Sequence, residues 1–306
     1  MNRTITPWVW LKQVLSLSVL GVMSIPAWAQ LNVVTTTSSM GMLARTVGGA
    51  WVQVTELAPP DRDAHTVQVK PSMIQAVRRA QVVVSVGAEL EQGWLPLVID
   101  NAANPPVRAG QNGYFEAAAQ VTRLDVQGAA GADRARGDVH PLGNPHVQLD
   151  PVRMGVIAHA LAQRLALLDP NHAAQFKANA QAFDQLIQQH MPRWQAKTQG
   201  VAGVLLYHHD ANYLLNRLGV PILGYIEPMA GMPPTAQHIA ALVGQYRGQA
   251  GQVISMTYQT NGGIGTLAQA LHWNASALPA DVPTGATAGQ YVQLIDQWVA
   301  VLSQVR

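Results

Sequence analysis

The chain has 306 residues and no cysteine, with 48% hydrophobic and 12% charged residues and a formal net charge of +2. Without cysteine it cannot be a disulfide-stapled mini-protein or hold a metal through thiolates, and its hydrophobic content excludes a disordered chain. Because a domain usually has about 100–200 residues, we expect two domains, each with its own core.

Residues 1–29 have the three parts of a secretory signal peptide. Arg3 and Lys12 form a basic start, an uncharged stretch follows, and Ala27-Trp28-Ala29 gives small residues at a cleavage site. The apolar stretch is shorter than the about twenty residues that cross a bilayer. We therefore expect the mature chain to lie in the periplasm. Since it has no cysteine, we also expect it to carry no lipid anchor.

Loss of the signal peptide changes the charge. Removing Arg3 and Lys12 lowers Lys and Arg from 19 to 17, which equals the 17 Asp and Glu residues. No run of basic residues or basic helix face is evident in the sequence. Nucleic-acid binding needs such a basic surface, so we expect no nucleic-acid partner.

From residue 31 onward, short apolar runs alternate with helical patterns. We expect strands at 31–37, 51–57 and 81–86, and helices at 40–47, 71–79 and 94–101. Ser38 or Ser39 is the expected N-cap of the first helix. This alternation predicts a parallel sheet covered by helices, with ligands bound at the carboxyl ends of its strands.

The middle of the chain predicts one long helix. A Gly- and Ala-rich loop at 123–143 precedes a helix at 151–168. After Asn171, apolar residues recur at three- and four-residue spacing over about 25 residues, which indicates one amphipathic helix. Such a helix would be about 40 Å long. We expect this stiff element, residues 171–198, to link an N-terminal lobe at 30–170 to a C-terminal lobe at 199–306.

The C-terminal part repeats the α/β pattern. Expected strands lie at 203–207, 221–225 and 252–257, and expected helices at 211–218, 235–246, 265–271 and 288–302. The sequence therefore predicts an α/β protein of two similar, parallel-rich lobes joined by one long rigid helix. Because that link is stiff, we expect a small rocking or loop movement on ligand binding and no wide hinge opening.

Histidine must supply the chemistry, since cysteine is absent. Of the ten histidines, His65, His146 and the pair His208-His209 come just after predicted strands or beside proline and glycine. The others lie mostly in predicted helices, where a packed or solvated imidazole is the more ordinary role. Imidazole is a preferred Zn²⁺ ligand, and a tetrahedral site needs only one donor beyond three histidines.

Four motifs occur in a recognisable order along the mature chain. They are Asp-Ala-His at 63–65, Asn-Pro-His-Val-Gln-Leu-Asp-Pro at 144–151, His-His-Asp-Ala-Asn-Tyr at 208–213 and Glu-Pro-Met at 227–229. This series resembles the periplasmic zinc/manganese solute-binding proteins of ABC importers, the cluster A-I type. The resemblance extends over essentially the whole mature chain, and the Asn-Pro-His element is its most specific part.

The resemblance implies a metal ion in the cleft between the lobes, held by three histidines and a carboxylate. It nominates His65, His146 and His208, the last because the family has histidine five residues before a tyrosine, here Tyr213. His209 is the alternative third ligand. For the carboxylate it nominates Asp281, in the loop before the last helix.

Glu227 is the alternative carboxylate, or else it orients a ligand histidine. His140 lies in a short Gly/Ala loop where many relatives have a long histidine-rich run, and we expect it to be a bystander.

Three imidazoles and one carboxylate suit zinc, with manganese as the alternative. The resemblance implies that a monomer captures the ion and delivers it to an ABC permease at the inner membrane. A metal chaperone or adhesin on the same scaffold is an alternative role. A secreted zinc hydrolase is disfavoured, because the sequence has neither His-Glu-x-x-His nor Gly-x-Ser-x-Gly. We therefore expect no enzymatic activity.

Overall fold

The computed structural model describes residues 30–126, 140–229, 231–259 and 263–305. The predicted signal peptide, residues 1–29, lies outside these ranges, as does most of the predicted loop at 123–143. Within the described ranges, no helix is both long enough and apolar enough to span a membrane.

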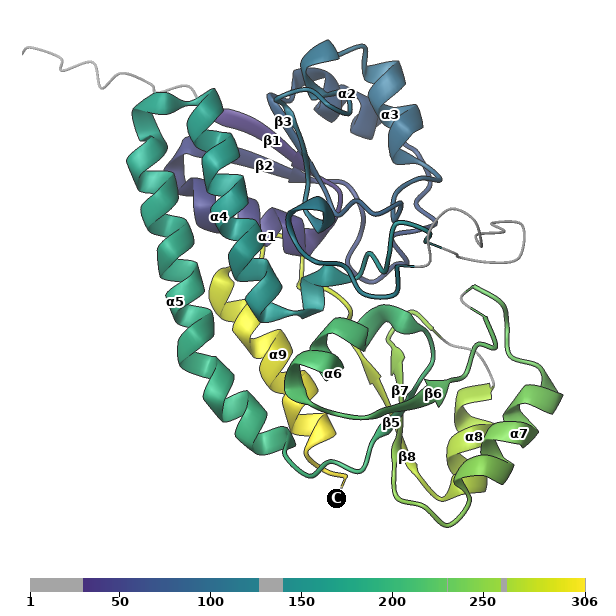
Figure 1. The fold of residues 1–306 in the computed structure, drawn as a ribbon. Helices are drawn as coiled ribbons and strands as arrows, with labels where there is room; N and C mark the ends of the chain where they lie inside the picture. The colour runs from purple at the N-terminus through teal and green to yellow at the C-terminus, as the bar shows by residue number, and fades with distance from the viewer. Residues whose placement is uncertain (1–29, 127–139, 230, 260–262, 306) are drawn as a thin grey trace, which may run out of the picture.

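The N-terminal lobe is built on a parallel four-stranded sheet in the order β2-β1-β3-β4 (Figure 1). Its strands are β1 (Leu31–Thr35), β2 (Val52–Glu56), β3 (Val82–Ser85) and β4 (Tyr114–Glu116). Its helices are α1 (Ser38–Gly48), α2 (Pro71–Arg79) and α3 (Leu95–Ala102). Thr37 caps α1 by accepting from the backbone N–H of Met40, one residue before the cap that the sequence predicts.

The C-terminal lobe has the same design, with a parallel sheet in the order β6-β5-β7-β8. Its strands are β5 (Val204–Leu206), β6 (Ile222–Tyr225), β7 (Gln252–Met256) and β8 (Asn274–Leu278). Its helices are α6 (Asn212–Leu218), α7 (Ala236–Tyr246) and α8 (Gly263–Leu271).

The predicted α/β class with two parallel sheets is therefore confirmed. One edge strand in each sheet was not predicted from the sequence. β4 has only three residues, and β8, with the sequence Asn-Ala-Ser-Ala-Leu, is mostly small and exposed. Neither offers the β-branched apolar run that marks an inner strand.

The long helix is confirmed as α5 (Ala173–Thr198), with 26 residues. It packs on α1 and on α4 (Pro151–Leu168) at one end, and on α6 and α9 (Ala288–Leu302) at the other (Figure 1). One face is buried at the predicted spacing, through Phe176, Ala180, Phe183, Ile187, Met191, Trp194 and Thr198. Pro192 removes one backbone hydrogen bond, yet the helix continues beyond it.

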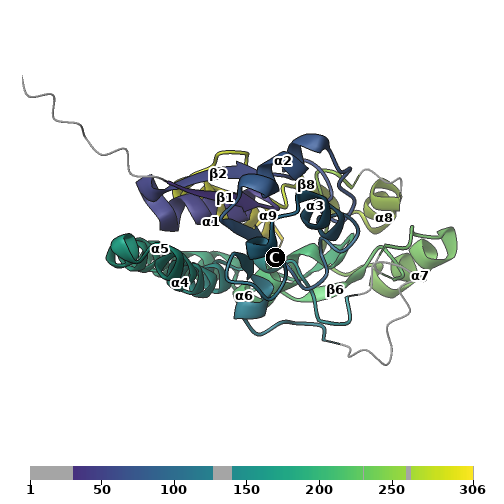
Figure 2. The same ribbon diagram turned by 90° about the horizontal axis from the view of Figure 1, so that it is seen from above.

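The main hydrophobic core is shared by both lobes. It includes Val33 and Leu43 of the first lobe, Phe183 of α5, and Leu206 and Trp298 of the second. Smaller clusters lie under α2 and α3 and under α7 and α8. Figure 2 shows α1 between the first sheet and the pair α4 and α5. The lobes are thus joined by packed side chains as well as by chain connections, while their exact boundaries stay a prediction.

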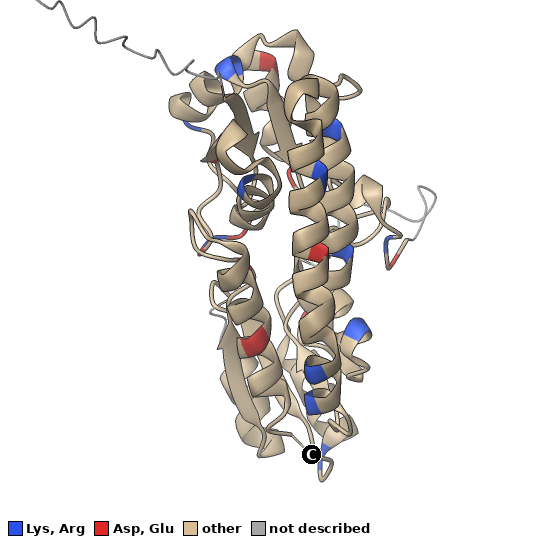
Figure 3. Ribbon diagram, turned by 90° about the vertical axis from the view of Figure 1, so that its left-hand side faces the viewer, with Lys and Arg blue, Asp and Glu red and all other residues tan. Residues whose placement is uncertain are grey.

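Charges along α5 are few and of both signs, in Lys177, Asp184, Arg193 and Lys197 (Figure 3). In the ribbon of Figure 3, Lys and Arg positions are scattered along the described chain on the side that faces the viewer.

Candidate metal centre

The candidate ligands lie where the two lobes face each other. His65 is in the loop that follows β2, and His208 comes two residues after β5. His146 immediately precedes a short 3-10 turn, Val147–Leu149, that leads into α4. His65 and His208 thus follow the carboxyl ends of strands, where open α/β sheets place their ligands.

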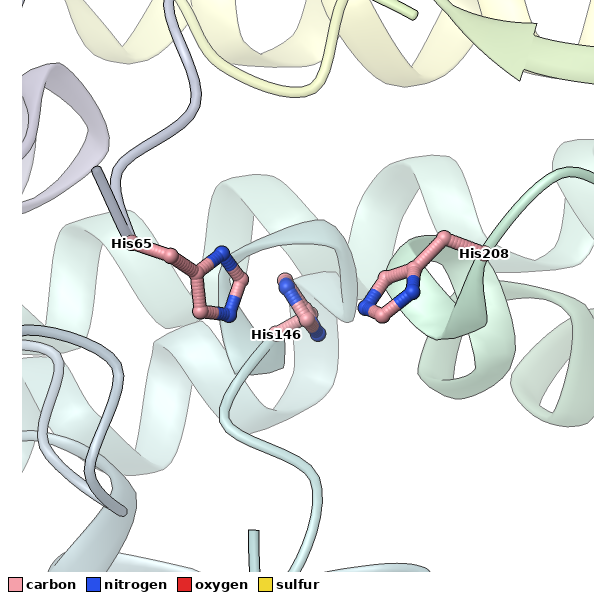
Figure 4. Close-up of side chains that lie close together, drawn as sticks. All are labelled: His65, His146 and His208. Carbon is pink, nitrogen blue, oxygen red and sulfur yellow. The ribbon is translucent and has the colours of Figure 1, made fainter. Parts of the chain in front are cut away.

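Three imidazoles converge at this place (Figure 4). One ring nitrogen from each of His65, His146 and His208 lies within 4.8 Å of the others. The ring centroids are 5.2 Å apart for His65 and His146, 5.4 Å for His146 and His208, and 6.1 Å for His65 and His208. Zinc–nitrogen bonds of about 2.1 Å at tetrahedral angles require nitrogens about 3.4 Å apart. Small ring movements therefore suffice to enclose an ion.

The Nδ1 atom of each of these rings faces an oxygen acceptor. His65 Nδ1 lies 2.7 Å from Asp63 Oδ1, and His146 Nδ1 lies 2.9 Å from Asn144 Oδ1. His208 Nδ1 lies 2.8 Å from Glu227 Oε2. In the neutral ring these acceptors fix the proton on Nδ1, which leaves the Nε2 lone pair as the metal-binding atom. All three rings are thus prepared to bind a cation through the same nitrogen.

Two of these acceptors share a local motif. Asp63 and Asn144 each stand two residues before their histidine, and each also accepts from that histidine's backbone N–H at 2.9 Å. One side-chain oxygen thus holds both the backbone and the ring of the following histidine. The repeated Asp/Asn-x-His spacing is visible in the sequence and is a signal by which Asp63 and Asn144 could have been predicted as orienting residues.

The surroundings of His208 carry negative charge. His208 is 7% exposed, and burial alone would lower its pKa. The charges of Asp210 and Glu227, together with the hydrogen bond to Glu227, outweigh burial and raise the pKa of His208 above its ordinary value. Asp210 Oδ1 also lies 3.5 Å from His146 Nε2. Asp210 was not among the site residues predicted from the sequence.

Asp281 is partly buried and is not among the three residues that the described structure groups within 4.8 Å. Its Oδ1 accepts from the hydroxyl of Ser39 on α1 and from the backbone N–H of Val282. Burial raises the pKa of Asp281 to about 7 in spite of these hydrogen bonds.

Tyr258 feels the charges of three aspartates of this region, among them Asp281. Burial raises the pKa of Tyr258, and the charges of Asp210, Asp63 and Asp281 raise it further. The Tyr258 hydroxyl donates to Asp210 Oδ1 at 3.0 Å.

The two alternatives from the sequence occupy other positions. His209 stacks on Tyr225 with ring centroids 3.8 Å apart, and the described cluster includes His208 instead. Glu227 accepts from His208 Nδ1 and from the backbone N–H of Gly231, as expected of a residue that orients a ligand.

His140 lies beside His65, with 3.1 Å between their Nε2 atoms. This position beside the three-histidine cluster was not predicted from the sequence. No sequence signal shows that the chain turns back there.

Comparison with known proteins identifies the family. The family model for the periplasmic zinc-uptake complex component A, ZnuA, matches residues 33–305. The chain belongs to this family. Its members are periplasmic metal-binding proteins of ABC importers, and they bind solute without catalysing a reaction. The predicted family, the periplasmic location, the binding of a metal ion and the absence of enzymatic activity are therefore confirmed for a member of this family.

Individual relatives are named for different metals, some for zinc and others for manganese. The chain is 23% identical to the high-affinity zinc uptake system protein ZnuA of Yersinia pestis over 253 residues, 75% of this chain and 76% of that protein. It is also 23% identical to the manganese ABC transporter substrate-binding lipoprotein PsaA of Streptococcus pneumoniae over 159 residues, 50% of this chain and 47% of that protein. Family membership therefore establishes a divalent-metal carrier without fixing its metal.

Solved structures agree on the fold. A crystal structure of ZnuA superposes with a TM-score of 0.74 at 20% identity and covers 89% of this chain and 98% of that one. The solute-binding protein FpvC of Pseudomonas aeruginosa, in complex with Mn²⁺, gives a TM-score of 0.74 at 19% identity, over 90% of this chain and 97% of its own. At these identities the comparison supports the fold alone.

Proposed function

We propose that this protein captures zinc in the periplasm and delivers it to an ABC permease in the inner membrane. The observation that carries the proposal is the convergence of three imidazoles whose Nδ1 atoms all face oxygen acceptors. Nitrogen donors of this kind favour zinc over manganese, which prefers more oxygen ligands. Manganese is the alternative cargo.

The proposed ligands are His65, His146, His208 and Asp281. In this proposal the three histidines supply Nε2 atoms, and the partly buried carboxylate of Asp281 supplies the oxygen that completes a tetrahedral set. The hydrogen bond from Ser39 of α1 to Asp281, which stands in the loop before α9, supports a carboxylate that reaches the N-terminal lobe. A protonated Asp281 would lose its proton to bind the ion, so uptake of zinc releases protons.

The carrier acts as a monomer without a lipid anchor in this proposal. The absence of cysteine from the sequence supports the second point, because acylation of a bacterial lipoprotein requires that residue. We propose residues 1–29 as the signal peptide that is removed on export.

Metal analysis of the mature chain, purified without added metal, tests the function. We expect one zinc per chain, displaced by a chelator and restored by titration. Substitution of His146 by Ala should abolish stoichiometric binding, whereas substitution of His159, on the exposed face of α4, should not change it. Stoichiometric zinc in the His146→Ala variant would refute the site, and preferential recovery of manganese would refute the cargo.

A further inference from the structure

A fourth imidazole lies against those of His65, His146 and His208. His140 Nε2 is 3.1 Å from His65 Nε2, and the two ring centroids are 5.1 Å apart. The His140 ring centroid is also 6.4 Å from that of His146. The distance between the two Nε2 atoms is close to the about 3.4 Å that separates two nitrogens bound to one tetrahedral zinc ion.

The hydrogen bonds of His65 assign the protons in this pair. Asp63 holds the proton of His65 on Nδ1, so His65 Nε2 is an acceptor and His140 Nε2 donates to it. His140 therefore caps the lone pair with which His65 would bind a metal ion. When an ion arrives, His65 releases this hydrogen bond and the His140 ring turns away from it. Once the ring has exchanged its proton from Nε2 to Nδ1, the Nε2 lone pair can bind the ion.

The backbone holds His140 near the cluster. The N–H of Gly143 donates to the carbonyl of His140 at 2.9 Å, and the N–H of Asn144 donates to the carbonyl of Leu124 at 2.8 Å. Gly143 has φ 105°, a conformation that favours glycine. This turn keeps the His140 ring close in space to that of His146, six residues further along the chain.

We propose that His140 is a further ligand of the transported ion. This inference rests on the proposed function. A fourth imidazole lets the site hold zinc with or without the carboxylate of Asp281, whose Oδ1 is engaged by Ser39. An additional nitrogen donor also increases the preference for zinc over manganese. His140 is thus a ligand that specifies the metal.

A double-mutant cycle tests whether His140 and Asp281 substitute for each other. Zinc affinity is measured by competition with a chromophoric chelator for the mature chain and for the variants His140→Ala, Asp281→Ala and the double variant. We expect the double variant to lose at least tenfold more affinity than the product of the two single losses. Equal zinc affinities of Asp281→Ala and the double variant would overturn the inference.

A second measurement reports on the ligand directly. Co²⁺ bound to the Asp281→Ala variant should give a visible spectrum that changes when His140 is also replaced, by Ala or by Gln. An unchanged spectrum would overturn the inference. Thermal unfolding of each variant confirms that it is folded, and His159→Ala is the matched histidine control.

The His146→Ala variant separates the two proposals. If it still binds zinc stoichiometrically, the proposed function itself fails. If it loses zinc while replacement of His140 in the Asp281→Ala background changes neither affinity nor spectrum, only the assignment of His140 as a ligand fails.

Discussion

Glu227 provides a direct test of how the third imidazole is prepared for metal binding. Its Oε2 lies 2.8 Å from His208 Nδ1, and the two side chains are 11% and 8% exposed. The same oxygen accepts from the N–H of Gly231 at 2.9 Å, which fixes the carboxylate in place. Substitution of Glu227 by Ala removes the acceptor that sets both the proton position and the orientation of the His208 ring.

The expected loss follows from the role of such acceptors. Removing a hydrogen-bonded partner of a ligand histidine lowers metal affinity by about 10–100-fold. This range corresponds to about 1.4–2.8 kcal/mol of binding free energy. Glu227 also contributes to the raised pKa of His208, so its removal should make that ring a weaker base as well as a more mobile one. Both effects reduce zinc affinity.

Zinc competition titrations should compare three variants with the unchanged chain. Glu227→Ala should lose affinity in the stated range. Glu227→Gln retains a side-chain oxygen that can accept from His208, so it should lose clearly less. Asp100→Ala, on the exposed surface of α3, is the control for loss of an acidic side chain. Equal losses for Glu227→Gln and Glu227→Ala would show that Glu227 acts through its charge and not through the hydrogen bond to His208. No loss in either variant would refute an orienting role.

Three further predictions concern pH, stability and shape. Because Asp210 and Glu227 raise the pKa of His208 against the effect of burial, protons should begin to compete for its ring above the ordinary imidazole pKa of about 6.5. Zinc affinity should therefore fall as the solution is acidified from neutral pH, and constant affinity would contradict this. The folded chain holds the proton of Asp281 with a pKa of about 7, above the ordinary 3.8. Metal-free stability is therefore lost as pH rises from about 4 through 7, and Asp281→Asn should unfold at a higher temperature than the unchanged chain at pH 8. That gain, at most about 4 kcal/mol, should shrink towards pH 4 in calorimetry. Arg217 of α6 lies 3.1 Å from the buried Asp150 at the start of α4, and this ion pair holds the two helices together. Small-angle scattering should therefore show a change in radius of gyration below about 1 Å on zinc binding. A change of several ångströms would refute a small rocking movement.

Sequence patterns predicted best the features that depend on local periodicity. The buried face of α5 follows the spacing of its apolar residues, because a helix places residues three and four apart on one side. The inner strands were found because each contains a short apolar run, which is mostly valine in β3 and Val-Leu-Leu in β5. β4 and β8 were missed because edge strands need no such run, and their pairing is decided by the neighbouring strand.

The candidate site was predictable only in part. His65, His146 and His208 could be selected because they follow strands or adjoin proline, where a folded scaffold presents side chains. The approach of His140 to His65 depends on a turn at Gly143, and it joins two residues that are 75 positions apart in the sequence. The proximity of Asp210 to His146 likewise arises from tertiary packing, which no spacing in the sequence encodes.

The three imidazole rings differ in whether their hydrogen-bond acceptor is a neighbour in the sequence or is brought close by tertiary structure. Asp63 and Asn144 each stand two residues before their histidine, so a short peptide segment can already orient His65 and His146. His208 instead depends on Glu227, which is 19 residues away and follows β6, the neighbour of β5. Pairing of these two strands must therefore precede the orientation of His208. The three-histidine site is complete only when the C-terminal sheet has formed, which couples zinc affinity to the stability of that sheet.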